Sequence, residues 1–221
     1  MISHSRRGLR ILTKANNIGT AVSPHFILAS GSSRRLQLLN QIGIIPDLVI
    51  SPNIDETYLE GAKPRQHTSR LSMEKASVIS IKYPNSIILS ADTIVIKGNK
   101  ILSKPTNASD ALNCIKMLSG GRHRVITSVC IIDTKENKKL KLVQSIVKFK
   151  SLSAFEIDTY IESGEWRGKA GGYAIQGLAA QFIPWISGSY TNIVGLPIFE
   201  TSCLLYSVGL CTISRNMDEK V

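Results

Sequence analysis

The order of strand and helix signals along the chain is the strongest constraint on its fold. An apolar run at 26–30 is followed by Leu36, Leu39 and Ile42 at helical spacing, and such alternation continues up to residue 210. The whole series reads β-α-β-α-β-β-α-β-β-α-β-α. Parallel strands require long crossovers, usually helices, whereas antiparallel strands can be joined by tight turns. The order therefore predicts an α/β fold in which helices flank a mixed sheet.

The individual elements are predicted from apolar periodicity and from turn residues. Strands are expected at 26–30, 47–51, 86–96, 123–134 and 141–152, with a further strand within 173–189. Helices are expected after the turn at 30–33 and at 67–83, 107–121, 153–165 and 197–210. The Gly98-Asn99 pair is typical of a hairpin turn. In such sheets ligands bind in a crevice beyond the strand ends.

Residues 25–210 are predicted to form a single domain, because no repeat, low-complexity segment or Pro/Gly-rich linker divides them. Residues 1–24 lack apolar periodicity and are expected to be a flexible extension, and residues 211–221 a loose tail. The four cysteines form no metal-binding pattern, which favours buried thiols in a reducing, cytoplasmic location. No apolar run approaches the roughly 20 residues that span a bilayer, so no membrane partner is expected.

The net charge of +11 indicates an anionic partner. Nucleic acid, an acidic membrane surface and a phosphorylated small molecule all fit this charge. The charge is uneven, because residues 1–46 contain five arginines and one lysine but no acidic residue. A second basic stretch at 134–150 is predicted to be a hairpin turn followed by an edge strand that its lysines protect from further pairing.

The turn at 30–33, with the sequence Ser-Gly-Ser-Ser, and the two arginines that follow it predict a phosphate-binding site. A glycine- and serine-rich turn at a helix N-terminus offers backbone N–H groups and hydroxyls to an anion, and Ser30 and Ser32 are the candidate hydroxyl donors. Arg34 and Arg35 lie at the positive end of the helix dipole, where cations are unfavourable unless an anion binds there. In the alternative, both arginines point to solvent and the serines only cap the helix.

Asp92 interrupts a run that otherwise has the composition of a core strand. A buried carboxylate must be paired, neutralised or bound to a metal, because an unpaired buried charge is costly. Hydrogen bonds from backbone amides are the alternative for Asp92. Asp55 and Glu56 follow the strand-ending Pro52, and one of the two could reach a divalent cation, although acidic loop residues are usually just solvated.

Two further segments contain polar residues suited to binding. Lys104 precedes Pro105, which disfavours a helix at the lysine. The glycine-rich window 167–197 contains Lys169 and Gln176 and is predicted to form functional loops. Gln176 has both a donor and an acceptor, which suits recognition of a nucleobase edge.

The motifs, taken together and in order, resemble those of the Maf family of nucleoside triphosphate pyrophosphatases. They are LASGSSRRLQLL, IDE, RLSMEKA, ADTIVI, LSKP, MLSGGRHRVITSV, GKAGGYAIQGLAAQFI and GSYTNIVGLPIFET, and they cover residues 26–206. The resemblance implies an α/β fold with an elongated mixed sheet and a deep cleft between two lobes. It also implies hydrolysis of a nucleoside triphosphate to the monophosphate and pyrophosphate with Mg²⁺ or Mn²⁺.

The resemblance also implies roles for individual residues, with Asp92, Lys75 and Lys104 as the catalytic set. Asp92 matches a catalytic base or metal ligand, and Asp55 matches a second acid beside the metal. Phosphate contacts are implied for Arg34, Lys75 and Lys104. The segment AGGYAIQG resembles the type that prefers dTTP and UTP, and its specificity positions correspond to Arg34, Thr93 and Gln176. Ser33 and Ser90 depart from the proline and glycine that are common in the family.

Three classes of function are distinguishable from this sequence. The first is a pyrophosphatase that acts on dTTP, UTP or modified pyrimidine nucleotides. The second is a nucleic-acid-binding or septum-formation regulatory protein without turnover, which the basic charge motivates. The third is a phosphatase that releases orthophosphate. The first is preferred, with a nucleoside triphosphate as partner, no specific nucleic acid, and a homodimer as a plausible state.

Overall fold

The computed structural model describes residues 25–59 and 61–210. The predicted N-terminal extension, 1–24, and the predicted tail, 211–221, lie outside the described residues. The helices and strands of the described part follow the predicted order, with one additional short helix and two 3₁₀ turns.

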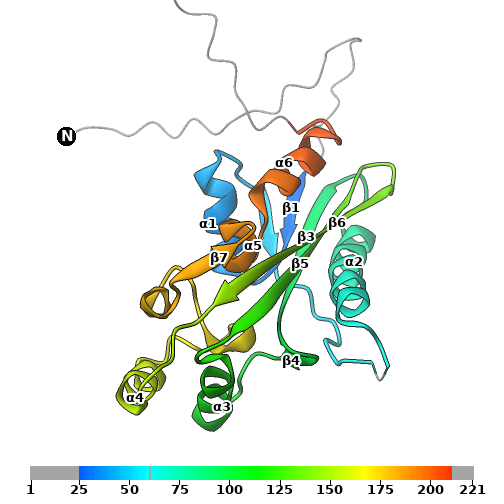
Figure 1. Cartoon of the computed structure of the whole chain (residues 1–221). Coiled ribbons are helices and arrows are strands. Elements are labelled where there is room, and N and C mark those ends of the chain that lie inside the picture. The colour runs from blue at the N-terminus through cyan, green and yellow to red at the C-terminus, as the bar shows by residue number, and fades with distance from the viewer. Residues whose placement is uncertain (1–24, 60, 211–221) are drawn as a thin grey trace, which may run out of the picture.

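A single seven-stranded sheet runs through the domain (Figure 1). Its strands are β1 (Phe26–Ala29), β2 (Leu48–Ile50), β3 (Ile87–Lys97), β4 (Lys100–Leu102), β5 (Arg122–Ile132), β6 (Lys138–Lys148) and β7 (Trp185–Ser187). The strand order is β2-β1-β3-β5-β6-β7, and β4 pairs with β3. Strand β1 is parallel to both β2 and β3, while the other pairs are antiparallel. The sheet is therefore mixed, as the order of elements predicts.

The helices divide between the two faces of this sheet (Figure 1). They are α1 (Ser33–Gln41), α2 (Pro64–Lys82), α3 (Ala108–Leu118), α4 (Ala154–Glu162), α5 (Tyr190–Val194) and α6 (Ile198–Tyr206). The 3₁₀ turns are η1 (Ala170–Gly172) and η2 (Leu178–Phe182). Helix α2 covers one face, where Ala76 and Ile79 pack on Ile88. The other helices lie on the opposite face or at the far end of the sheet.

Strand β3 has a gap along one of its edges. Strand β1 pairs with residues 87–90 of β3, and β4 pairs with residues 95–97 of the same edge. Residues 91–94 between them have a strand neighbour only on the β5 side. The gap opens where β1 ends, which is the place at which α/β sheets bind ligands.

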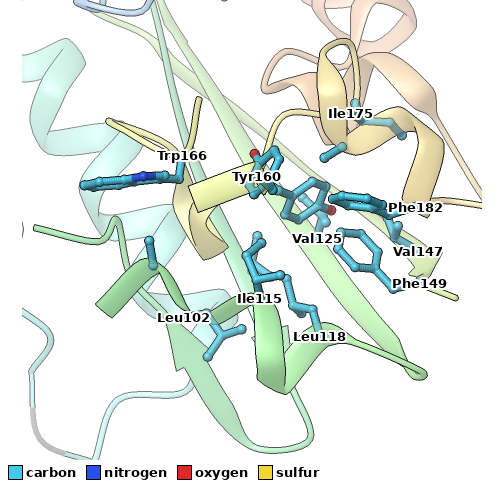
Figure 2. Close-up of a cluster of buried hydrophobic side chains, with 14 of the residues drawn as sticks. Leu102, Ile115, Leu118, Val125, Val147, Phe149, Tyr160, Trp166, Ile175 and Phe182 are labelled. Atoms are coloured by element: carbon cyan, nitrogen blue, oxygen red, sulfur yellow. The ribbon is translucent and has the colours of Figure 1, made fainter. Parts of the chain in front are cut away.

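Two hydrophobic clusters fill the face opposite α2, and the gap lies between them. One contains Leu38 and Ala91 together with residues of α6. The other contains Val95 and a group of aromatic rings around Tyr160, Phe149 and Phe182 (Figure 2). Side chains at alternate positions of a strand share a face, so a polar residue at position 93 lies between these two cores. Each cluster supports one lobe, and their boundary is a natural cleft.

Two segments differ from the predicted structure. Helix α2 begins at Pro64, three residues before the predicted start, because proline suits the first helical position and the Gln66 side chain accepts a hydrogen bond from the Lys63 N–H. Only 185–187 of the segment 173–189 is a strand, and the rest forms turns and η2. The unpredicted helix α5 starts where the Ser189 hydroxyl accepts a hydrogen bond from the Asn192 N–H.

The basic stretch at 134–150 contains β6, and only residues 146–148 of that strand pair with β7. Along the rest of this edge, the Lys138 ammonium donates to Ser77 and the Lys139 ammonium to Ser207. The prediction of an edge strand therefore holds for residues 138–145 and is wrong for 146–148, which pair with β7. No helix in the described ranges has the length and hydropathy that a bilayer crossing requires.

Among the described cysteines, only Cys130 is fully buried. Cys114 is half-buried, and Cys203 is exposed. The expectation that all the cysteines are buried is therefore wrong for Cys203. All three are free thiols.

Burial of His123 in the aromatic cluster makes stability depend on pH. The His123 ring is 2% exposed, and its Nε2 lies 2.8 Å from the Tyr173 hydroxyl. Burial, with a smaller contribution from Lys97, lowers the pKa of His123 to about 3. Because this lies below the ordinary pKa of 6.5, the unfolded chain binds more protons between these two pH values.

We therefore expect the free energy of unfolding to fall as the pH is lowered through 6.5. From pH 6.5 to pH 5 the loss due to His123 is on the order of 1 to 2 kcal/mol, and His123→Gln should remove it. Urea denaturation of both proteins across this range measures the difference. Parallel pH profiles for the two proteins would contradict the assignment.

Candidate active site

A cavity of about 400 Å³ lies in the cleft between the two lobes, at the gap in β3. Its volume falls within the range of small-molecule sites. All but one of the predicted site residues line it, namely Ser30, Ser32, Arg34, Arg35, Lys75, Asp92, Thr93, Lys104, Lys169 and Gln176. The exception is Asp55. The fold thus brings together side chains from five separate segments of the chain.

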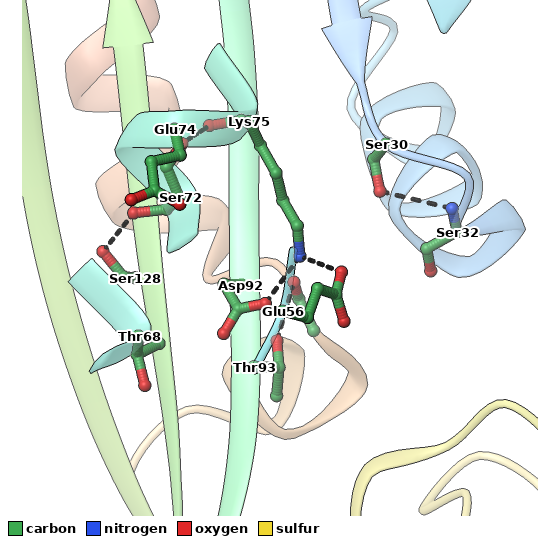
Figure 3. Close-up of polar contacts among 12 residues, drawn as sticks. Ser30, Ser32, Glu56, Thr68, Ser72, Glu74, Lys75, Asp92, Thr93 and Ser128 are labelled. Atoms are coloured by element: carbon green, nitrogen blue, oxygen red, sulfur yellow. Dashed lines mark hydrogen bonds and ion pairs between the residues drawn. The ribbon is translucent and has the colours of Figure 1, made fainter. Parts of the chain in front are cut away.

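The turn between β1 and α1 forms one wall of the cavity. The Ser30 hydroxyl accepts a hydrogen bond from the Ser32 N–H at 3.2 Å (Figure 3). Ser32 is the N-cap residue of α1, and its side chain makes no capping hydrogen bond. Gly31 lets Ser51 approach the turn closely, because a Cβ at this position would lie 2.8 Å from the Ser51 hydroxyl. The start of α1 can therefore present N–H groups to an anion in the cavity.

Arg35 braces the site from within, and its predicted contact with phosphate stays a prediction. Its guanidinium donates to the Gly195 carbonyl at 2.8 Å, to the Ser30 hydroxyl at 3.0 Å and to the Thr93 hydroxyl at 3.1 Å. These bonds join the β1–α1 turn, β3 and the end of α5. Burial lowers the pKa of Arg35 to about 10, so the side chain stays cationic at neutral pH.

Arg34 also lines the cavity. Its guanidinium makes no hydrogen bond to any other of the described residues. Partial burial lowers the pKa of Arg34. Within the described residues, the three hydrogen bonds of Arg35 leave it fewer donors for a ligand than Arg34 has.

A chain of alternating charges crosses the floor of the cavity. The Lys75 Nζ lies 2.7 Å from Asp92 Oδ1 and 2.7 Å from Glu56 Oε1 (Figure 3). The Lys104 Nζ lies 3.0 Å from Glu56 Oε2. The side chains of Lys75 and Asp92 are each only 7% exposed, so their pair is poorly screened by water. The buried aspartate predicted from its apolar strand is thus paired with a lysine from α2.

The second oxygen of Asp92 is buried and has no hydrogen-bond partner among the described residues. Its cross-strand neighbour on β5 is Ser128, whose hydroxyl pairs instead with that of Ser72 at 2.8 Å. A buried carboxylate oxygen without a hydrogen-bond partner is suited to bind a cation or to accept a hydrogen bond from a water molecule.

Glu56, and not its neighbour Asp55, lies in the charged cluster. Partial burial opposes ionisation of Glu56, but Lys75 and Lys104 outweigh it and lower the pKa of this carboxyl to about 2. The Asp55 carboxylate accepts hydrogen bonds from the Thr57 N–H and hydroxyl, and it faces an adjoining pocket. The sequence identifies both acids as candidates, and the family resemblance implies Asp55 as the second acid beside the metal. The structure places Glu56 in the lining of the cavity instead of Asp55.

The opposite wall comes from the glycine-rich segment after α4. Lys169, Gln176 and Arg167 line the cavity there, and Arg167 also stacks on Trp166 at 4.7 Å. Burial, together with the nearby Arg34, lowers the pKa of Lys169. Arg167 was not predicted from the sequence, where it looks like any other exposed loop arginine.

The cavity as a whole is strongly cationic. Six lysine and arginine side chains and two carboxylates line it, which leaves a formal charge of +4. Such a field attracts a small molecule with several negative charges. The same residues provide carboxylate oxygens at one point of the cavity floor, so both an anion and a divalent cation could be held there.

The sequence comparison identifies the family to which this site belongs. The model of the Maf family, described as "Maf-like protein", matches residues 25–208. This chain is a member of the Maf family. The match spans every described strand and helix and all residues of the cavity.

Curated relatives agree with this membership. The Maf chain is 53% identical over 184 residues to a dTTP/UTP pyrophosphatase of Roseobacter denitrificans, covering 83% of this chain and 97% of the relative. It is 48% identical to a dTTP/UTP pyrophosphatase of Caulobacter vibrioides, covering 86% and 98%. It is 49% identical to a nucleoside triphosphate pyrophosphatase of Anaplasma marginale, covering 81% and 91%.

Solved structures give a more distant match. The Staphylococcus aureus Ham1 protein is 12% identical, with 89% of this chain and 90% of that chain covered and a TM-score of 0.40. This likeness is too distant to bear on the function of the Maf chain.

The buried pair in the floor of the Maf site predicts a strong effect on stability. Removing one partner of a buried ion pair leaves an uncompensated charge and costs about 3 to 5 kcal/mol. We expect Lys75→Met to lower the free energy of unfolding by about 3 kcal/mol in metal-free buffer, because Asp92 then loses the ammonium that lies 2.7 Å from its Oδ1.

The double variant Lys75→Met/Asp92→Asn should recover part of this loss, since it removes the stranded charge. Urea denaturation of the wild type, Lys75→Met, Asp92→Asn and the double variant measures the coupling. A loss below about 1 kcal/mol for Lys75→Met, or strictly additive losses, would contradict the pairing.

Proposed function

We propose that this Maf protein hydrolyses dTTP and UTP, and related modified pyrimidine nucleotides, to the monophosphate and pyrophosphate. The observation that supports this proposal most directly is the cationic cavity between the two lobes, which has the Asp92 carboxylate in its floor. The names of relatives about 50% identical over most of their length support the substrate class. The cytoplasmic location and the homodimer expected from the sequence stay predictions.

The charge of the cavity suits a triphosphate chain. A nucleoside triphosphate carries about four negative charges, which match the formal charge of the lining. Arg34, Lys104 and Lys169 lie on different walls, so they could contact different phosphates. Charge that develops on the α-phosphate oxygens and on the leaving pyrophosphate during the reaction would be stabilised by these groups, which are already in place before substrate binds.

Asp92 is the proposed general base or water-orienting group. Its Oδ1 is held by the Lys75 ammonium, which fixes the rotamer, while Oδ2 has no protein partner in the described structure. A water that donates to Oδ2 would be oriented, and could lose a proton, as it attacks the α-phosphorus. The proton would pass to the carboxylate, and the bond to the pyrophosphate oxygen would break.

The site also fits a divalent cation, Mg²⁺ or Mn²⁺. No group of three or more His, Cys, Asp or Glu side chains within the described ranges forms a metal cage. Mg²⁺, however, is commonly held by one or two carboxylates together with substrate phosphates and water. Asp92 would hold it through the unpartnered Oδ2, with Glu56 as the second carboxylate, and Asp55 remains a predicted ligand. When bound, the ion would supply charge neutralisation for the phosphates.

Base recognition is assigned to Gln176 and Thr93. Gln176 lines the cavity from the loop side, and its amide offers a donor and an acceptor to a pyrimidine edge. The Thr93 hydroxyl is already held by Arg35 and by Thr127 at 3.0 Å. Thr93 therefore acts as a fixed wall, and the Gln176 amide supplies the contact to the base.

The direct test is product analysis with an Asp92→Asn variant. We expect wild-type protein with Mg²⁺ or Mn²⁺ to release pyrophosphate from dTTP and UTP. Asp92→Asn should lower kcat by about 10²- to 10⁴-fold, because the carboxylate can no longer take up a proton. Asp158→Asn on the exposed face of α4 is the matched control and should leave kcat unchanged.

Two results would contradict this proposal. Release of orthophosphate would indicate a phosphatase. Near-normal turnover by Asp92→Asn would show that Asp92 has no role in the chemical step, even if pyrophosphate is the product.

A further inference from the structure

We propose that Glu165 is a positioning residue that holds Gln176 in place for recognition of the base. This inference rests on the proposed function, because it assigns a role within the same site. Glu165 does not line the cavity, and it matches none of the predicted catalytic or binding positions. Its carboxylate instead binds the backbone that directly follows Gln176.

The Glu165 carboxylate clamps two successive N–H groups. Oε2 accepts a hydrogen bond from the Leu178 N–H at 2.8 Å, and Oε1 accepts a longer one from the Ala179 N–H at 3.4 Å. These residues begin η2, where the first N–H groups have no partner within the turn. A carboxylate is well suited to this place because its two oxygens can serve both donors at once.

Gln176 is fixed from both sides by this arrangement. On its N-terminal side, the Gly177 N–H donates to the Ala174 carbonyl at 3.1 Å, which closes a tight turn around Gln176. On its C-terminal side lie the two clamped N–H groups. A Cβ at position 177 would overlap the Glu165 carboxylate, so only glycine lets the carboxylate approach so closely.

Glu165 is itself anchored to the aromatic core. The Tyr160 hydroxyl, from a ring that is 2% exposed, donates to Glu165 Oε1 at 3.2 Å, and it also lies 3.2 Å from the Gly172 carbonyl. The Glu165 N–H donates to the Ser163 hydroxyl at 3.2 Å. These contacts connect Glu165 to the aromatic core, but they are separate from the two N–H bonds that form the clamp.

The same residue contacts the phosphate side of the cavity. The Lys169 ammonium donates to the backbone carbonyl of Glu165. Glu165 thus lies between Lys169, a predicted phosphate contact, and the Gln176 turn, a predicted base contact. A single anchored residue sets the spacing between the two ends of a bound nucleotide.

The experiment compares base discrimination among variants. The quantity is the ratio of kcat/KM for dTTP to kcat/KM for dGTP. Gln176→Ala should lower this ratio about 10-fold, because a polar contact to the base is what distinguishes one base from another. Glu165→Ala should lower it by a similar factor, and the double variant should fall no further, within about twofold. Glu165→Gln, which keeps one good acceptor, should lie between Glu165→Ala and the wild type.

Tyr160→Phe is the matched control for a purely structural effect. It removes one hydroxyl contact to Glu165 but leaves the two N–H bonds of the clamp. We expect it to lower the melting temperature while leaving the dTTP-to-dGTP ratio within about twofold of wild type. Hydrogen exchange of the Leu178 and Ala179 amides, measured without nucleotide, should speed up about 10-fold or more in Glu165→Ala but not in Tyr160→Phe.

Three results would overturn the inference. They are an unchanged ratio in Glu165→Ala, independent additive losses in the double variant, and unchanged amide exchange in Glu165→Ala. An unchanged ratio in Gln176→Ala would also overturn it, while hydrolysis of dTTP would still stand. If the wild type hydrolyses no dTTP, the proposed function fails, and the amide exchange alone still decides whether Glu165 holds the loop.

Discussion

The ion pair between Lys75 and Asp92 is the interaction on which the rest of the site depends. A carboxylate in the middle of an apolar strand is tolerated only because an ammonium from α2 lies 2.7 Å away. The same ammonium holds Glu56, which in turn holds Lys104. One buried charge on β3 thereby draws a helix, a loop and the segment after β4 to a common point.

The cleft follows from how the sheet is paired and from how its core is divided. Strands β1 and β4 share one edge of β3 but leave residues 91–94 unpaired on that side. Two separate hydrophobic clusters support the walls, and Arg35 ties one wall to the floor through Thr93. Rigid walls matter for phosphate chemistry, because fixed cations stabilise developing charge without having to reorganise.

The sequence predicts the order of elements, and all but one of the predicted site residues line the cavity. It does not predict which of two neighbouring side chains is used. Asp55 and Glu56 are adjacent in a loop, and only tertiary contacts with Lys75 and Lys104 select Glu56. Arg34 and Arg35 are likewise adjacent, and the bond that commits Arg35 to bracing comes from Gly195, far along the chain. The 3₁₀ turns near Gln176 escaped prediction because they show no strand or helix period.

A structure of the protein with Mg²⁺ and a non-hydrolysable dTTP analogue tests the central claim most directly. The account predicts that the α-phosphate lies beside the Asp92 carboxylate, with the remaining phosphates against Arg34, Lys104 and Lys169 and the base against Gln176. An analogue bound outside this cleft would contradict the account. So would an analogue in the cleft whose α-phosphate lies at the far wall, out of reach of Asp92.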